Sequence, residues 1–86
     1  MLLDGKPCAI EEARAVEGAL ARELEGVLEG EEMEGAALVF GRRLFLGDSD
    51  GFMEVTRIKP AGKNSMMVKA YLLGAKLGGA TRWGAA

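Results

Sequence analysis

The chain has 86 residues and a net charge of −2, and its length allows one small domain over residues 1–86. Hydrophobic residues make up 49% of the chain, which is enough for one apolar core and excludes an intrinsically disordered protein. Cys8 is the only cysteine and no apolar run approaches the roughly 20 residues of a membrane span, so we expect a cytoplasmic protein without disulfides or membrane partners.

Residues 8–16 follow the turn sequence Asp-Gly-Lys-Pro and have two interpretations. Their glutamate, alanine and arginine favour a helix, on which Ile10, Ala13 and Val16 would share one face. The alternative is a strand whose larger inward side chains are Cys8, Ile10 and Val16. Propensity alone favours the helix.

Residues 17–34 contain leucine and valine at helical spacing, which predicts one or two helical turns around residues 19–25. Glycines interrupt this segment too often for one long helix, because each costs up to ~1 kcal/mol relative to alanine. The acidic residues near its end are expected to form a solvated loop: Glu29, Glu31, Glu32 and Glu34.

Residues 36–47 predict a hairpin, with strands at Ala37–Phe40 and Leu44–Leu46 joined by a Gly-Arg-Arg turn. Both strands are apolar runs without alternation, which indicates that both of their faces are covered, as in a small closed barrel. A second hairpin is predicted at Asp50–Gly51, because both turn residues can take positive φ.

The strand predicted over residues 52–59 contains a change of period. Met53 and Val55 share one face of a regular strand, whereas Ile58 falls on the other face. Either both faces are covered, or a bulge near Thr56–Arg57 resets the register.

A short helix is predicted after the Pro-Ala-Gly-Lys sequence at residues 60–63, whose proline ends the preceding strand. We expect the helix to begin between Asn64 and Met67, capped by Asn64 or Ser65, and to end at Gly74. The side chains expected along its apolar stripe are Met66, Ala70 and Leu73, with Met67 and Tyr71 beside them.

The order of these features resembles the C-terminal domain of methionyl-tRNA formyltransferase. That family runs Gly-Asp-Gly, an apolar strand, Pro-x-Gly-Lys, a methionine and a short helix that ends near a glycine. The most specific part of the resemblance is residues 60–63 together with Met66, and the clear match covers about a third of the chain. The matching residues are Gly47, Asp48, Gly51, Met53, Val55, Ile58, Pro60, Gly62, Lys63, Met66, Leu72 and Gly74.

The resemblance implies a mainly β fold, a small antiparallel barrel of the oligonucleotide-binding kind with one short α-helix. It favours the strand interpretation of residues 8–16, since the family opens on a Gly-Lys-x-Leu-x-Ile strand. It also implies a short strand at Gly26–Glu29 and a last strand that closes the barrel, with apolar contacts from Leu77 and Trp83.

Charge is unevenly distributed along the chain. Residues 1–34 hold three basic and ten acidic side chains, a sum of −7, while residues 35–86 hold eight basic and three acidic ones, a sum of +5. This asymmetry is typical of proteins that meet nucleic acid or a membrane surface. The candidates for a phosphate-contacting patch are Lys59, Lys63, Arg42, Arg43 and Arg57; the alternative is that these side chains are merely solvated.

Two familiar motifs are excluded by their spacing. A calcium loop opening at Asp48 would need a glutamate at its twelfth position, where the chain has Lys59. A phosphate-binding loop ending at Gly62–Lys63 would need a glycine at Arg57 and a hydroxyl residue at Asn64. A single phosphate at a helix N-terminus beside Gly62–Lys63 stays possible. No metal and no cofactor is expected.

Catalysis is poorly supported, because histidine is absent and Cys8 has no visible activating partner. The resemblance implies a non-catalytic accessory module that helps bind initiator tRNA through its backbone phosphates. Its partner would be a catalytic formyltransferase domain, in the same chain or another, which holds the Asn/His/Asp chemistry and the folate. The alternative is a protein–protein packing or oligomerisation module of a formyltransferase-like enzyme.

Overall fold

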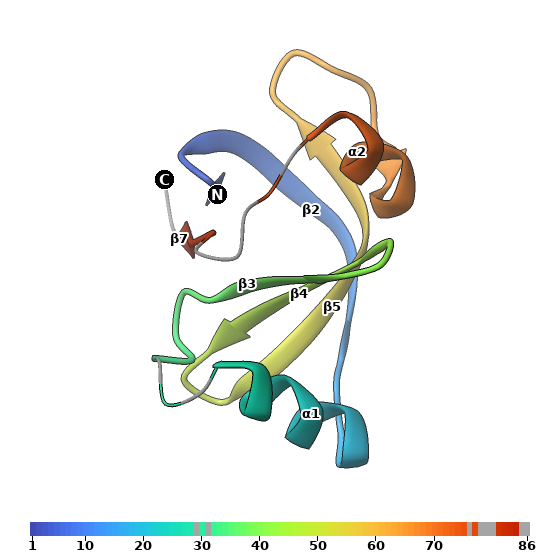
Figure 1. The fold of residues 1–86 in the computed structure, drawn as a ribbon. Coiled ribbons are helices and arrows are strands. Elements are labelled where there is room, and N and C mark those ends of the chain that lie inside the picture. The colour runs from blue at the N-terminus through green and yellow to red at the C-terminus, as the bar shows by residue number, and fades with distance from the viewer. Residues whose placement is uncertain (29, 31, 76, 78–80, 85–86) are drawn as a thin grey trace.

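A computed structural model of the chain describes residues 1–28, 30, 32–75, 77 and 81–84 (Figure 1). Its elements are β1 (Leu2–Leu3), β2 (Lys6–Ala15), α1 (Gly18–Leu28), β3 (Ala37–Phe40), β4 (Arg43–Asp48), β5 (Gly51–Pro60), β6 (Met66–Met67), α2 (Val68–Gly74) and β7 (Trp83–Gly84). The strands follow the order β3-β4-β5-β2-β1-β7, with β6 on β5, and every pair is antiparallel. The predicted mainly β class is confirmed.

The two ends of the sheet meet, so the barrel is nearly closed. The short strand β7 pairs with β1, and a bridge joins Arg82 to Ala36, just before β3. The Trp83 N–H also donates to the Gly35 carbonyl at 3.0 Å. The predicted closing strand is confirmed, although it has only two residues, and the described residues Leu77 and Trp83 both pack on the core.

The strand interpretation of residues 8–16 is confirmed as far as Ala15, where β2 ends, and the helix that propensity favours is wrong. β2 pairs with β5 along nearly its whole length, from Cys8 opposite Pro60 to Ala15 opposite Met53. The hydrogen bonds of this long ladder outweigh helix preferences that differ by well under about 1 kcal/mol per residue. The turn before it uses Asp4 and Gly5, both at positive φ.

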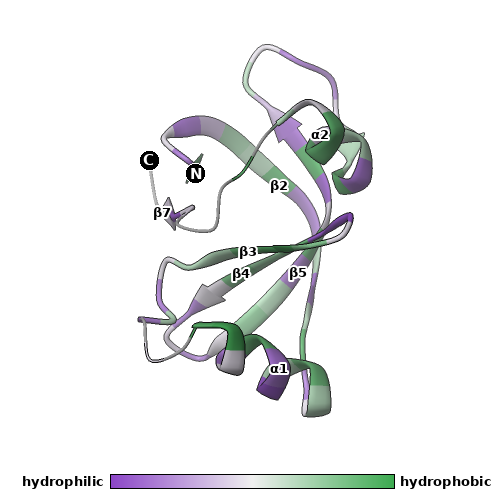
Figure 2. Ribbon diagram, in the orientation of Figure 1, coloured by the Kyte–Doolittle hydropathy of each residue, from purple (hydrophilic) through white to green (hydrophobic). Residues whose placement is uncertain are grey.

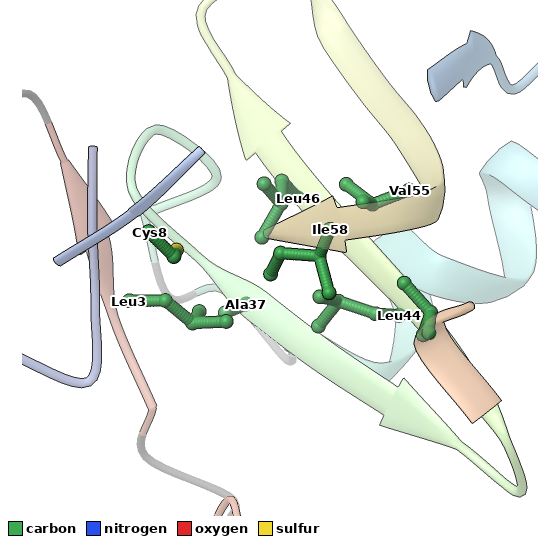
Figure 3. Packing of buried hydrophobic residues seen from close by; sticks show 8 residues of the cluster. Leu3, Cys8, Ala37, Leu44, Leu46, Val55 and Ile58 are labelled. Atoms are coloured by element: carbon green, nitrogen blue, oxygen red, sulfur yellow. The ribbon is translucent and has the colours of Figure 1, made fainter. Parts of the chain in front are cut away.

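The sheet separates two apolar clusters. One lies inside the barrel beneath α2, and Figure 3 shows how its side chains converge. The other lies beneath α1. Leu44 and Leu46 enter the first cluster and Phe45 the second, which confirms that this apolar strand is covered on both faces.

The change of period in β5 is resolved by a bulge. Across β2 and β5, Ile58 lies opposite Ile10, Arg57 opposite Glu12 and Val55 opposite Ala13, so one residue on each strand is skipped. The skipped residue on β5 is Thr56, so of the two alternatives that the sequence left open, the bulge is the one that the structure has. As a result, residues 55 and 58 share the same buried cluster.

The β4–β5 hairpin is confirmed, but its turn lies one residue earlier than predicted. Asp48 pairs with Gly51, so Ser49 and Asp50 form the loop, and only Gly51 among the four has positive φ. The Asp48 carboxylate sets this geometry, because its Oδ1 accepts the N–H of Asp50 at 2.8 Å and of Gly51 at 3.0 Å.

The helices differ most from the expectations. α1 is a full helix that continues through Gly26 to Leu28, so the described part of the chain has two helices. The strand expected at residues 26–28 is wrong, and Glu29 lies outside the described residues. The reason is tertiary: Leu24 and Leu28 bury in the cluster with Phe52.

α2 begins later and presents another face than predicted. Met66 and Met67 pair with β5 as β6, which delays the helix to Val68 and leaves Met67 as an N-cap without a side-chain hydrogen bond. The predicted Asn64 or Ser65 cap is therefore wrong. The buried face is Val68 with Tyr71 and Leu72, while Leu73 from the predicted stripe is 75% exposed. The helix ends at Gly74 as expected.

Candidate nucleic-acid interface

The two helices mark two ends of the molecule with opposite charge. α1 lies at one end of the sheet and α2 at the other (Figure 1). Acidic side chains gather around α1 and the β4–β5 turn: Glu17, Glu23, Glu25, Asp48 and Asp50. Around α2, hydrophilic segments occur at the end of β5, at the β3–β4 turn and in the first helical turn (Figure 2), and the charged side chains there are basic: Arg42, Lys59, Lys63 and Lys69.

Arg43 forms an ion pair with Glu54, although its side chain is 48% exposed. Its Nε lies 2.8 Å from Oε2 of Glu54, and Arg14 reaches the other oxygen, Oε1, at 2.7 Å. Glu54 is buried, with only 6% of its surface exposed. Hydrogen bonds from Arg43, which outweigh the opposing effect of burial, and then from Arg14 lower the pKa of Glu54 to about 2. The Arg43 guanidinium also lies 5.0 Å from the centre of the Phe45 ring.

Arg57 and Lys59 lie on the face of β5 opposite the barrel core, because they flank the buried Ile58. Arg57 is partly neutralised by Glu12 across the strand pair, at 3.3 Å between Nε and Oε1. Lys59 is exposed, and within the described part of the chain no acidic side chain pairs with it.

A small hollow of about 150 Å³ brings Arg42 and Arg43 beside Lys69. The hollow opens at Thr56 of β5. Along this edge of β5, β4 pairs as far as Val55 and β6 pairs from Arg57 onward, so neither strand pairs with Thr56. Glu54 is the only acidic residue among those lining the hollow that the structure describes, and it is already shared by two arginines.

A larger groove of about 500 Å³ brings Lys63 beside Lys6. The start of β2 and the β5–β6 loop form one side, where the N–H of Ala61 donates to the Pro7 carbonyl at 3.1 Å. α2 forms the other side and contributes Tyr71. Burial raises the pKa of the Tyr71 hydroxyl, and electrostatic repulsion from the ionised forms of Cys8 and Asp4 adds to this effect.

Lys6 and Lys69 complete this basic end and were not among the sequence candidates. Lys6 is remote in sequence from the other lysines, and only the pairing of β2 with β5 places it beside the β5–β6 loop. The sequence feature that could have pointed to Lys6 is the repeated Lys-Pro at residues 6–7 and 59–60. In the β2–β5 register the two prolines lie within one residue of each other.

The phosphate site that the sequence left open at a helix N-terminus beside Gly62–Lys63 is not formed. Gly62 lies in a turn at φ 76°, and α2 begins only at Val68, after β6. Lys63 therefore contributes its charge to the groove side and not to the helix terminus.

The groups available for chemistry are few. Burial, partly opposed by the N-terminal ammonium, raises the pKa of the Cys8 thiol and so disfavours the nucleophilic thiolate. Across the described residues, no three acidic, cysteine or histidine side chains are grouped as a metal would require. None of the helices in that part is long and apolar enough to cross a membrane.

The fold and charge pattern define a small antiparallel barrel with a basic end. Comparisons with models of protein families, with curated proteins and with solved structures give no match to this chain. The likeness to the formyltransferase C-terminal domain therefore rests on the sequence features alone.

Proposed function

We propose that this domain is a non-catalytic accessory module that helps hold a tRNA, the initiator tRNA of a formyltransferase system, through its backbone phosphates. In this role it acts in the cytoplasm beside a catalytic formyltransferase domain, in the same chain or another. The sequence resemblance supplies the particular partner, and the charge distribution supplies the general mode of binding.

The separation of charge between the two ends is the observation on which the proposal depends. Among the described residues, the ion pairs of the sheet involve Arg14, Arg43 and Arg57, while the lysines around α2 have no acidic partner. A polyphosphate chain binds more tightly to clustered unpaired cations, because each neutralised phosphate releases counterions. The acidic α1 end is repelled, so the molecule approaches RNA with α2 foremost.

The binding surface in this proposal differs from the five sequence candidates. Arg42, Lys59 and Lys63 remain, because they are exposed and unpaired within the described part of the chain. Lys6 and Lys69 join them. Arg43 and Arg57 contribute less, since nearby carboxylates offset much of their charge.

The test is binding of initiator tRNA to the 86-residue chain across a salt series, read by anisotropy of labelled tRNA. We expect log affinity to fall linearly with log salt, with a slope of about −2 to −4.5 if three to five phosphates are neutralised. Lys63→Glu and Arg42→Glu should each weaken binding and flatten the slope by about 1. Arg22→Glu, the matched charge reversal on α1, should change neither.

Absence of binding at about 50 mM salt would contradict the proposal, and so would an equal effect of the Arg22 reversal. The second outcome would show that overall charge, and not the basic end, determines the affinity.

A packing module is the second candidate function, and apolar exposure favours it. Val39 and Phe40 lie exposed on β3. Along residues 37–40, β3 pairs with β4 on one side. Leu73 projects from α2. In this alternative the catalytic formyltransferase domain covers these side chains. Light scattering of the chain, alone and mixed with a formyltransferase catalytic domain, tests it: a complex that Phe40→Ser abolishes would support packing.

A further inference from the structure

The groove beside α2 is lined by apolar side chains and a tyrosine as well as by two lysines, and solvation of the lysines does not explain these other residues. Its two sides are held by separate elements, the β2 start with the β5–β6 loop and the helix α2. Apolar residues line it together with the two lysines: Pro7, Pro60, Ala61, Met66, Ala70 and Ala75. Its volume of about 500 Å³ falls in the range of about 300–1,000 Å³ that is typical of small-molecule binding pockets in proteins.

Tyr71 gives this groove an aromatic wall with one polar group. Its side chain is half-buried against the barrel core and also lines the groove. Its hydroxyl stays protonated at neutral pH and can donate a hydrogen bond. An aromatic face beside cations is the combination that binds an unstacked base together with its phosphates.

The charges around the groove favour an anionic chain. Lys6 and Lys63 both line it, and neither has an acidic partner in the part of the chain that the structure describes. No acidic side chain appears among the described residues that line it; Asp4, in the turn before β2, is close enough to act on the Tyr71 hydroxyl but does not line the groove.

We propose that this groove accepts one unpaired nucleotide of an RNA chain, with its base against Tyr71 and Met66 and its flanking phosphates at Lys6 and Lys63. This inference rests on the proposed function and narrows it. A base inside a duplex is stacked and paired, so it cannot enter, whereas bases in loops and at ends are free to do so. The domain should therefore prefer single-stranded loops and tails over helical stems.

The experiment compares two labelled RNAs of equal phosphate number at one salt concentration: a hairpin with an unpaired loop and a blunt duplex. The wild-type chain should bind the hairpin more tightly. Because stacking of one base on an aromatic side chain is worth about 1–3 kcal/mol, Tyr71→Leu should weaken hairpin binding by about 5- to 150-fold. Tyr71→Phe, which keeps the aromatic face, should stay within about threefold of wild type.

A second variant keeps the test independent of core packing. Ala70 is exposed on α2 and lines the groove, so Ala70→Leu fills the groove without entering the core. It should remove the preference for the hairpin while leaving duplex binding unchanged. Leu73→Gln, on the outer side of the same helix, is the matched control and should behave as wild type.

The outcomes separate this inference from the proposed function. If both RNAs bind equally, with a normal salt slope and no effect of Tyr71→Leu or Ala70→Leu, the nucleotide groove is refuted and phosphate binding stands. If neither RNA binds, both fail. If the groove variants instead abolish capture of a formyltransferase catalytic domain, the groove holds a protein segment, and the inference is refuted.

Discussion

Replacing Glu54 by glutamine should destabilise the fold at neutral pH in a way that disappears in acid. Glu54 is buried between Arg14 and Arg43 and accepts hydrogen bonds from both guanidinium groups. Glutamine keeps the shape and one acceptor oxygen but removes the negative charge. Because both arginines would then lose their counter-charge, the loss should be larger than for an ordinary surface glutamate.

The magnitude follows from the pKa of Glu54, which the arginines lower from 4.5 to about 2. A shift of about 2.5 units corresponds to about 3 kcal/mol of stabilisation above pH 4.5, as an upper bound. The arginine side chains are 67% and 48% exposed, so solvent screens part of this interaction. We therefore expect Glu54→Gln to cost about 1–3 kcal/mol at pH 7.

The sign of the pH dependence is fixed by the direction of the shift. Since the folded-state pKa of Glu54 is lowered, its contribution is present above about pH 4.5 and is lost as the pH falls toward about 2. The difference between wild type and Glu54→Gln should shrink over this window.

Urea unfolding followed by Trp83 fluorescence measures the effect, because the Trp83 indole donates to the Gly47 carbonyl at 2.9 Å and reports barrel closure. Glu25→Gln on α1, an exposed carboxylate, is the control and should be nearly neutral. A Glu54→Gln variant as stable as wild type at pH 7, or a difference that persists at pH 2, would refute the assignment.

The remaining predictions concern α1 and a close backbone approach, and the same unfolding assay checks them. Leu24→Ala should cost about 2–5 kcal/mol because Leu24 is fully buried beneath the sheet, while Val27→Ala, on the exposed side of α1, should change stability by less than about 0.5 kcal/mol; equal effects would contradict the docking of α1. A Cβ at Gly47 would collide with the carbonyl oxygen of Met33, so Gly47→Ala should cost more than about 1 kcal/mol. A Cβ at Gly26 would meet no neighbouring atom within 4 Å, so Gly26→Ala should stabilise the fold by about 0.5–1 kcal/mol. If Gly26→Ala destabilised the fold and Gly47→Ala stabilised it, the surroundings assigned to both glycines would be wrong.

Features that depend on a few neighbouring residues were predictable from the sequence. The two hairpins follow from apolar runs separated by Gly-containing turns. The bulge was visible because Val55 and Ile58 cannot share a face of a regular strand. In both cases the information is local, since turn chemistry and side-chain alternation operate over fewer than about ten residues.

Features fixed by tertiary pairing were not predictable in the same way. The face of α2 was assigned incorrectly because β6 takes Met66 and Met67, which changes the residue at which the helix begins. α1 was underestimated because burial of Leu24 and Leu28 offsets the cost of Gly26. Each outcome depends on a partner that lies elsewhere in the chain.

The candidate site was also only partly predictable, because a sequence shows which residues are charged but not which of these charges are neutralised by a partner in the fold. In the sequence, Arg43 and Arg57 were candidates for a phosphate contact in the same way as Lys59 and Lys63. Folding places a carboxylate beside each arginine and none beside the lysines within the described residues. It also brings Lys6 and Lys63 to the lining of one groove.

The ion triad at Glu54 links this division of charges to the proposed function. Arg43 lines the same hollow as Arg42 and Lys69, but its charge is offset by Glu54. Glu54→Gln should therefore weaken the fold while strengthening RNA binding, with a salt slope steeper by up to about 1 for one additional phosphate contact. In the double variant Glu54→Gln/Arg43→Gln the affinity should return to that of wild type. An unchanged slope in the folded Glu54→Gln chain would mean that the hollow does not meet RNA, and the contact surface would then be confined to the groove side of α2.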